Sequence, residues 1–214
     1  MIQMKDICYA YEDGTTALLH VNLSVEKGET LILRGANGCG KSTLLKIVNG
    51  LIFAGQGEYR FEGRVIDKKS MADTVFAKSF HQKIGYLFQN TDSQLFHNDV
   101  EDEIAFGPAR MGFSEEEIKK RADDMIRILD IEKLRHRAPY HLSCGEKKKV
   151  ALASILSVNP SVIVLDEPIS GLDTASSAWI VDFLKSMKKA GKTIVIATHN
   201  ERLADALADR EFQM

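Results

Sequence analysis

Hydrophobic positions along this chain change their spacing twice, and the changes divide it into three stretches. Residues 1–89 combine alternating apolar and polar positions with short apolar runs, which is typical of strands. Residues 90–159 have mainly helical spacing, and after Pro160 short apolar runs return between helical patterns. The predicted strands cover residues 2–11, 18–26, 29–34, 57–62, 84–88, 162–165 and 193–197, and the predicted helices include 41–51, 174–189 and 202–208.

Strands separated by helices predict an α/β fold with a mostly parallel sheet that is covered on both faces. A chain of 214 residues is long enough to bury a substantial core as one domain. We therefore expect a single domain over residues 1–214, with a core formed by about 1–89 and 160–214. The helical subdomain is expected over about 90–159.

Two local patterns in the helical stretch make specific predictions. Ser114 and Glu117 have the spacing of a capping box, in which each side chain satisfies a free N–H group of the first turn. The apolar residues that then share one helix face are Ile118, Ala122, Met125, Ile126 and Leu129. The basic run Lys147–Lys149 is predicted to lie on a solvated helix face, because apolar residues resume with helical spacing at Val150.

Composition excludes several classes of protein. Lys and Arg number 28 against 30 Asp and Glu, so the chain lacks the strongly basic character of a nucleic-acid binder and no nucleic-acid partner is expected. The three cysteines, at positions 8, 39 and 144, are odd in number and widely spaced, which favours free thiols in a reducing compartment. No apolar stretch approaches the ~18 residues of a membrane helix. We expect action at a membrane only through partners.

The strongest motif is a phosphate-binding loop, Gly35-x4-Gly40-Lys41-Ser42, between a predicted strand and a predicted helix. Glycines let backbone N–H groups point into a concave nest, where they and the helix N-terminus hold phosphates. Lys41 is expected to reach the β- and γ-phosphates of a nucleoside triphosphate, and Ser42 to ligate Mg²⁺. The loop also includes Asn37, Gly38, Cys39 and Thr43.

Polar residues directly after three apolar strands complete the predicted chemistry. Asp166 and Glu167 follow the run 162–165, where α/β sheets build their sites. Asp166 is suited to hold Mg²⁺, and Glu167 to orient or deprotonate the attacking water. His199 follows the strand 193–197 and could contact the γ-phosphate, whereas Gln89 follows the strand 84–88 and could reach Mg²⁺ and the water.

In this order, the motifs resemble the ATP-binding-cassette (ABC) family of transport ATPases over essentially the whole chain. The matching segments are the P-loop at 35–43, the Q-loop at Gln89, the signature at 142–146, Asp166-Glu167, the D-loop at 170–173 and His199. The segments 87–96 and 100–108 and Glu146 of the signature make the chain most similar to the energy-coupling-factor cassettes of cobalt, nickel and vitamin importers. It departs from them at Cys144, where glycine is common, and at Thr91 and Ser93.

The resemblance implies ATP and Mg²⁺ as cofactors, a P-loop NTPase core, an N-terminal antiparallel β subdomain and the inserted helical subdomain. It also implies that Tyr11, in preference to Tyr9 on the same strand face, stacks on adenine. Two cassettes are expected to close head to tail over ATP, with signature residues Ser143, Gly145 and Glu146 facing the partner's nucleotide and Asp173 crossing the interface. The P-loop and the signature are both intact, which favours a homodimer over pairing with a paralogue.

The resemblance thus predicts the ATP-hydrolysing subunit of a membrane importer, bound to integral membrane subunits at the cytoplasmic face of the membrane. The catalytic residues are then Glu167, His199, Lys41 and Gln89. The alternative is a soluble cassette of repair, cluster assembly or translation, although the chain lacks the coiled-coil insertion, tandem cassette or basic arms usual there. Many family members continue past the last core strand, so a chain ending at Met214 is either a short form or a truncated one.

Overall fold

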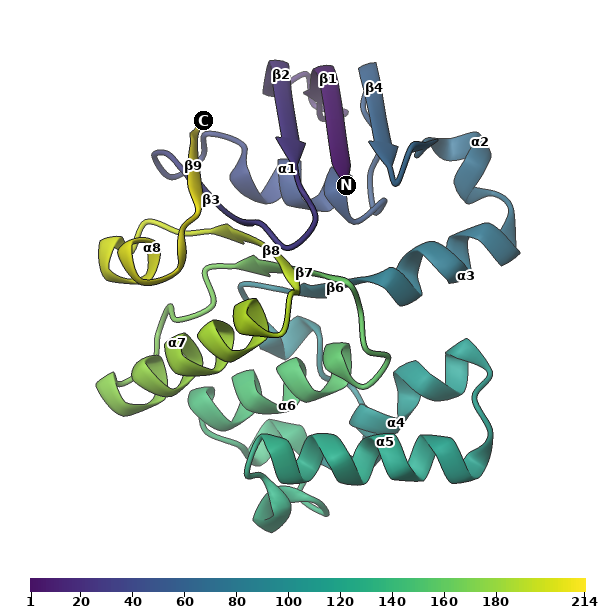
Figure 1. Cartoon of the computed structure of the whole chain (residues 1–214), viewed down its shortest axis with the longest axis vertical. Helices are drawn as coiled ribbons and strands as arrows, with labels where there is room; N and C mark the ends of the chain where they lie inside the picture. The colour runs from purple at the N-terminus through teal and green to yellow at the C-terminus, as the bar shows by residue number, and fades with distance from the viewer.

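The computed structural model describes residues 1–214, and its elements form two sheets and several layers of helices (Figure 1). The strands are β1 (Ile2–Ala10), β2 (Thr16–Val25), β3 (Thr30–Arg34), β4 (Gln56–Phe61), β5 (Arg64–Val65), β6 (Ile84–Leu87), β7 (Val162–Asp166), β8 (Thr193–Ala197) and β9 (Arg210–Gln213). The helices are α1 (Lys41–Val48), α2 (Lys68–Met71), α3 (Thr74–Lys83), α4 (Val100–Met111), α5 (Glu115–Ile128), α6 (Cys144–Leu156), α7 (Thr174–Lys189) and α8 (Glu201–Leu207).

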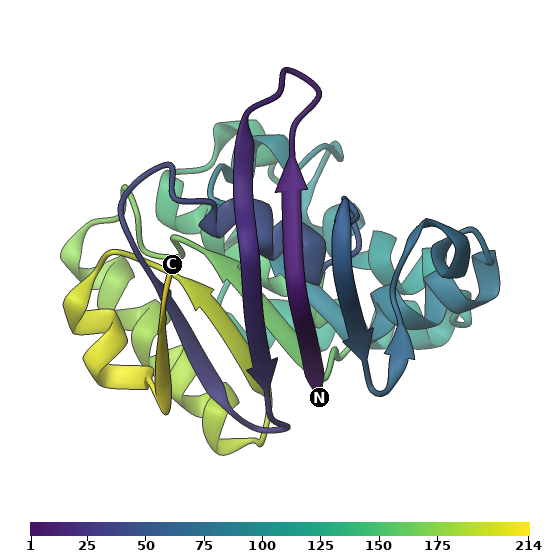
Figure 2. The ribbon, with the colours of Figure 1, turned by 90° about the horizontal axis from the view of Figure 1, so that it is seen from above.

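The central sheet has the strand order β6-β7-β8-β3-β9, and each neighbouring pair is parallel. The second sheet, β2-β1-β4-β5, is antiparallel. It lies over α1 on one side of the central sheet, whereas α4–α7 lie on the other side (Figures 1 and 2). The predicted α/β class, with a parallel sheet, an antiparallel N-terminal sheet and a group of helices, is confirmed.

Strand residues of the central sheet divide between two hydrophobic cores, because successive side chains point to opposite faces. On β7, Ile163 and Leu165 belong to the core shared with α4–α8, whereas Val162 and Val164 belong to the core under the antiparallel sheet. All five β7 residues are buried. Burial on both faces explains why this strand reads as a continuous apolar run and not as an alternating one.

Two sequence-based predictions in the helical stretch need correction. Lys148 is buried with 1% of its surface exposed, so the basic run 147–149 does not lie wholly on a solvated face. Ser114 does cap α5 by accepting from the N–H of Glu117. The Glu117 carboxylate, however, accepts from Arg121 one turn later, and the reciprocal half of the capping box is missing.

The helices α2 and α3 were not predicted, because among their residues only Phe80 is buried and the apolar stripe is correspondingly weak. Both helices begin with an aspartate cap, Asp67 and Asp73, whose carboxylates accept from backbone N–H groups of the first turn. None of the helices is both long and apolar enough to span a membrane.

Candidate nucleotide-binding site

A pocket of about 580 Å³ lies where β3, β6, β7 and β8 end. Parallel strands bring their carboxyl ends to one edge of the sheet, so residues distant in sequence meet there. The lining residues are Tyr11, Thr15, Thr16, Ala17, Asn37, Gly38, Gly40, Lys41, Ser42, Thr43, Gln89, Asp166, Glu167, Ser170 and His199. The structure therefore brings the predicted P-loop, Gln89, the carboxylate pair and His199 into one cavity.

The phosphate loop connects β3 to α1 and depends on glycine at two left-handed positions, Gly38 (φ 82°) and Gly40 (φ 99°). A Cβ atom added to Gly40 would lie 2.4 Å from the carbonyl oxygen of Ala17, so no larger residue fits there. The N-terminus of α1 has no side-chain cap, which leaves its first N–H groups to bind an anion. Lys41 Nζ donates to the carbonyl oxygens of Gly35 (2.7 Å) and Ala36 (3.0 Å), within reach of that anion site.

Glu167 is fixed by more donors than any other carboxylate of the pocket. Its Oε2 accepts from the hydroxyl of Thr198 at 3.0 Å, and its Oε1 accepts from the backbone N–H of His199 at 3.1 Å and from His199 Nδ1 at 2.8 Å. A carboxylate only accepts, so His199 Nδ1 carries the proton in this contact and Nε2 is left for a ligand. Glu167 also has a left-handed backbone (φ 45°), which is uncommon for a residue with a side chain and occurs often at functional sites.

Asp166 has the properties of a magnesium ligand. Burial raises the pKa of its carboxyl, with a contribution from the neighbouring Glu167, and hydrogen bonds with Ser42 and Tyr86 oppose the rise. A bound cation would reverse that effect of burial. The donors here are a hydroxyl, a carboxylate and the amide oxygen of Gln89, which suit a hard cation. No group of three or more His, Cys, Asp or Glu residues is placed to hold a metal ion.

Tyr11 lies at the mouth of the pocket, just after β1. Its hydroxyl hydrogen-bonds to Thr43 Oγ1 at 2.8 Å, and Tyr9 packs against it edge to face with 5.1 Å between the ring centroids. Tyr11 lines the pocket and Tyr9 does not. The arrangement favours Tyr11 as the residue available to a base, and its stacking on adenine stays a prediction.

The signature residues do not reach this pocket. Ser143 caps α6 and forms a reciprocal box with Glu146, whose Oε2 accepts from the Ser143 N–H and hydroxyl at 2.8 Å each. This bonding with Ser143 lowers the pKa of Glu146. A Cβ on Gly145 would lie 2.6 Å from Ser176 Oγ, and Asp173 caps the helix that carries Ser176. The N-termini of α6 and α7 therefore form one surface outside the chain's own pocket.

Sequence reasoning missed three residues that position the site. Thr198 is fully buried, and only its place directly after β8 could have indicated its contact with Glu167. The Tyr86 hydroxyl lies 3.5 Å from Asp166 Oδ2, and burial raises its pKa above the usual range. Lys148 donates to the backbone carbonyls of Phe88 and Gln89, and its spacing four residues before the buried Leu152 was the available signal.

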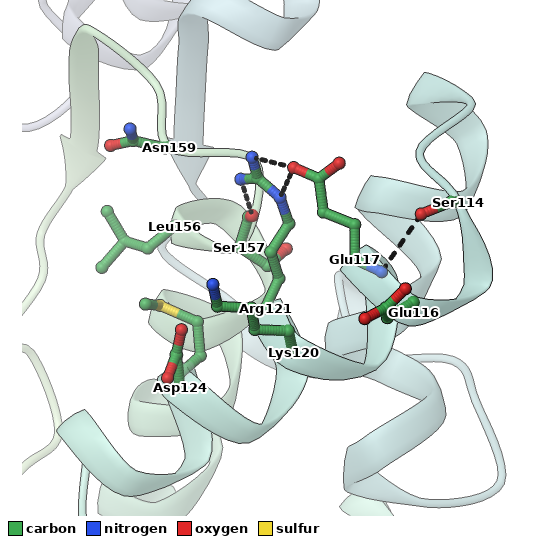
Figure 3. A pocket seen from close by; sticks show the side chains of 10 residues that line it. Ser114, Glu116, Glu117, Lys120, Arg121, Asp124, Leu156, Ser157 and Asn159 are labelled. Carbon is green, nitrogen blue, oxygen red and sulfur yellow. Dashed lines mark hydrogen bonds and ion pairs between the residues drawn. The ribbon is translucent and has the colours of Figure 1, made fainter.

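A second hollow, of about 560 Å³, lies beside α5 and the end of α6 and contains none of these residues (Figure 3). Its arginine is already paired with other residues of the hollow. Arg121 donates to the Glu117 carboxylate and to the carbonyl oxygen of Ser157, as the dashed lines in Figure 3 show. We therefore place the chemistry in the pocket at the strand ends.

Comparison with known proteins identifies the family of the chain. The profile of the ABC transporter family matches residues 18–170. The chain is 42% identical to the nickel import ATP-binding protein LarO of Lactiplantibacillus plantarum, over 98% of this chain and 87% of LarO. It is 39% identical to the energy-coupling factor transporter ATP-binding protein EcfA of Methanocaldococcus jannaschii, over 100% of this chain and 75% of EcfA.

Two solved structures share the fold over the whole chain. One is cbiO1 from Clostridium perfringens, part of the ABC transporter complex cbiONQ, with a TM-score of 0.86, 36% identity and 84% of its chain covered. The other is a dimeric ATP-binding cassette bound to ADP and Pi in a post-hydrolysis state, with a TM-score of 0.90, 28% identity and 94% of its chain covered. The resemblance to energy-coupling-factor cassettes is thereby confirmed, and the chain belongs to the ABC transporter family as one of its ATPases.

Proposed function

We propose that this chain is the ATP-hydrolysing motor of an importer of the energy-coupling-factor type, which carries a metal ion or a vitamin. The catalytic assignment in this proposal rests on the Glu167 carboxylate. Thr198 and His199 hold it by hydrogen bonds at the edge of the P-loop pocket. A carboxylate so oriented can accept the proton of an attacking water. The relation to LarO and EcfA supports the transport class and leaves the cargo open.

In this proposal ATP occupies the pocket with its phosphates on the P-loop and its base beside Tyr11. Lys41 exchanges its bonds with the loop carbonyls for the β- and γ-phosphates, and backbone N–H groups of residues 37–43 hold the remaining oxygens. Ser42, Asp166 and Gln89 would hold Mg²⁺, which supplies positive charge that neutralises the developing charge on the phosphates. His199 Nε2 faces the γ-phosphate while Nδ1 stays on Glu167.

The separation of signature and pocket supports a composite site. Ser143 and Gly145 lie at the N-terminus of α6, an anion-binding end of a helix, yet no phosphate site of their own chain lies there. We infer that they face the γ-phosphate bound by a second copy, in a head-to-tail dimer with Asp173 near the contact. Binding of ATP then closes the dimer and hydrolysis reopens it, which uses binding energy to shift a two-state equilibrium.

Exposed aromatic side chains near the segment after Gln89 fit a membrane subunit as partner. Phe96 and Phe106 pack edge to face, with 5.3 Å between the ring centroids, and 66% of Phe96 is exposed. Tyr140 is also exposed, and it lines the same hollow of about 470 Å³ as Phe96. We place the contact with integral membrane subunits here, at the cytoplasmic face of the membrane.

The first test concerns catalysis. Glu167→Gln keeps the size and most hydrogen bonding of the side chain but cannot take a proton, and loss of a general base commonly costs ~10²–10⁴ in rate. We expect the variant to bind ATP with normal affinity and to release phosphate at a small fraction of the wild-type rate. Near-normal turnover would refute the assignment of Glu167.

The second test concerns the transport role. The tagged chain, extracted with detergent from its native membranes, should co-purify with integral membrane proteins, one of which captures the cargo. Phe96→Asp should lose these partners while retaining ATP binding. Purely soluble partners, in a fraction with active ATPase, would instead favour a cassette of repair, cluster assembly or translation.

A further inference from the structure

Lys148 is the most deeply buried ammonium group of the chain. It lies in the second turn of α6, with 1% of its surface exposed. Removing an ammonium group from water costs free energy unless hydrogen bonds or opposite charges replace the hydration. Burial lowers the pKa of Lys148, and charge interactions with Cys144, Asp166 and Glu167 oppose that effect. The hydrogen bonds that replace the hydration of this ammonium group therefore indicate what the side chain holds in place.

Both observed acceptors of Lys148 belong to the segment that follows β6. Nζ donates to the carbonyl oxygen of Gln89 at 3.0 Å and to that of Phe88 at 3.3 Å. The neighbouring Lys147 bonds to Asp92 Oδ1 at 2.6 Å, a little further along the same segment. Helix α6 therefore holds residues 88–92 through two successive lysines, and the buried one fixes the backbone of Gln89 itself.

The two ends of this contact serve different nucleotides in the proposed dimer. Gln89 lines the pocket of its own chain. Ser143, five residues before Lys148, caps α6 on the surface that we assign to the partner's nucleotide. A displacement of Gln89 by ATP or by its hydrolysis would therefore be transmitted through Lys148 to the start of α6.

The geometry points to Lys148 as a positioning residue that locks the Gln89 backbone to the signature helix and thereby couples the two ATP sites of a dimer. This inference rests on the proposed composite site. It requires no contact of Lys148 with nucleotide, because the residue acts through Gln89 and α6. Coupling of this kind needs two sites and one element that both sites bias, and the segment 88–92 is that element.

The test compares three variants of the full chain. Lys148→Met keeps the length and volume but removes the donors, whereas Lys148→Gln retains one donor without a buried charge. Lys149→Met is the matched control on the same helix, because Lys149 Nζ lies 4.4 Å from the centroid of the Trp179 ring and the bonds to the segment 88–92 come from Lys147 and Lys148. Each variant is measured for melting temperature, for ATP affinity at protein concentrations that keep it monomeric, and for phosphate release against ATP concentration.

We expect Lys148→Met to bind ATP as the wild type does, but to show about a ten-fold lower kcat, since lost positioning lowers kcat without changing binding. Its Hill coefficient for ATP should fall from above one toward one, and Lys148→Gln should recover part of both values. Lys149→Met should match the wild type. A merely structural role would instead lower melting temperature and ATP affinity together with kcat.

Unchanged kcat and Hill coefficient in Lys148→Met would overturn the inference, as would a loss of ATP binding that parallels the loss of turnover. If Lys148→Met does not fold, Lys148→Gln is judged against the wild type by the same criteria. A separate result would show that the proposed composite site is wrong. In that case ATP would not drive dimerisation of the Glu167→Gln variant, whatever the Lys148 variants do.

Discussion

Replacement of Thr198 by valine isolates one hydrogen bond of the catalytic carboxylate. The Thr198 hydroxyl donates to Glu167 Oε2 at 3.0 Å and accepts from the backbone N–H of Asn200 at 3.1 Å. Thr198 is fully buried, and its backbone N–H donates to the carbonyl oxygen of Leu33 in β3. Valine can therefore occupy the same space without moving the backbone. Thr198→Ser keeps the hydroxyl and is the matched control.

The size of the expected change in kcat follows from the hydrogen bonds that Glu167 loses and keeps. A hydrogen bond to an ionised group contributes about 1.5–3 kcal/mol, which corresponds to about a 10- to 150-fold change in rate if it acts wholly in the transition state. Glu167 keeps both bonds from His199, so we expect the lower end, with kcat reduced about ten-fold in Thr198→Val. The unpaired N–H of Asn200 should also lower the free energy of unfolding by about 1–3 kcal/mol.

The assay is steady-state phosphate release at saturating ATP, together with ATP affinity and a thermal melt. Thr198→Val should keep the KM for ATP and lose kcat, whereas Thr198→Ser should retain both. Equal kcat in the two variants, with ATP bound normally, would show that the hydroxyl does not orient Glu167. The reasoning from this hydrogen bond would then be wrong, even if the stability change were seen.

Three further predictions concern the P-loop and the pH dependence of stability. Gly40→Ala should abolish ATP binding, since the new Cβ would lie 2.4 Å from the Ala17 carbonyl at a φ of 99°; normal affinity in equilibrium binding would contradict this. A maleimide on Cys39, whose sulfur lies 3.9 Å from Lys41 Nζ, should block ATP binding, bound ATP should protect, and Cys39→Ser should be insensitive. Complete labelling with unchanged binding would exclude this. Burial lowers the pKa of His81 from 6.5, so the unfolded chain takes up its proton first and unfolding free energy should fall as pH drops below that value. His81→Gln should weaken this dependence in denaturant titrations, and an identical pH profile would count against it.

The residues that the sequence predicted share one property, which is a position next to a strong local pattern. Asp166 ends a buried strand, Glu167 and His199 come just after one, and the P-loop stands between a strand and a helix. A parallel sheet brings such positions together at one edge, so local pattern and topology together place them. The sequence could not predict contacts that depend on the packing of distant segments.

Lys148 and Glu117 illustrate that limit. The backbone carbonyls that Lys148 binds lie about 60 residues earlier in the chain, and no local pattern reports a backbone acceptor. The Glu117 carboxylate had two possible partners within one turn, the free N–H of Ser114 and the guanidinium of Arg121, and it binds the charged one. A hydrogen bond to a charged group is the stronger of the two, which decides the competition.

The place of β3 in the central sheet has a consequence for how the protein is made. Its two neighbours, β8 and β9, come from the end of the chain, and the contact between Gly28 and Thr193 already spans 165 residues. A ribosome that adds about 5–20 residues per second therefore needs roughly ten to thirty seconds between the emergence of β3 and that of its partners. During that interval the apolar strand that carries the phosphate loop has no sheet to join. The nascent chain must keep this segment shielded, and it gains its nucleotide site only after β8 and β9 have left the ribosome.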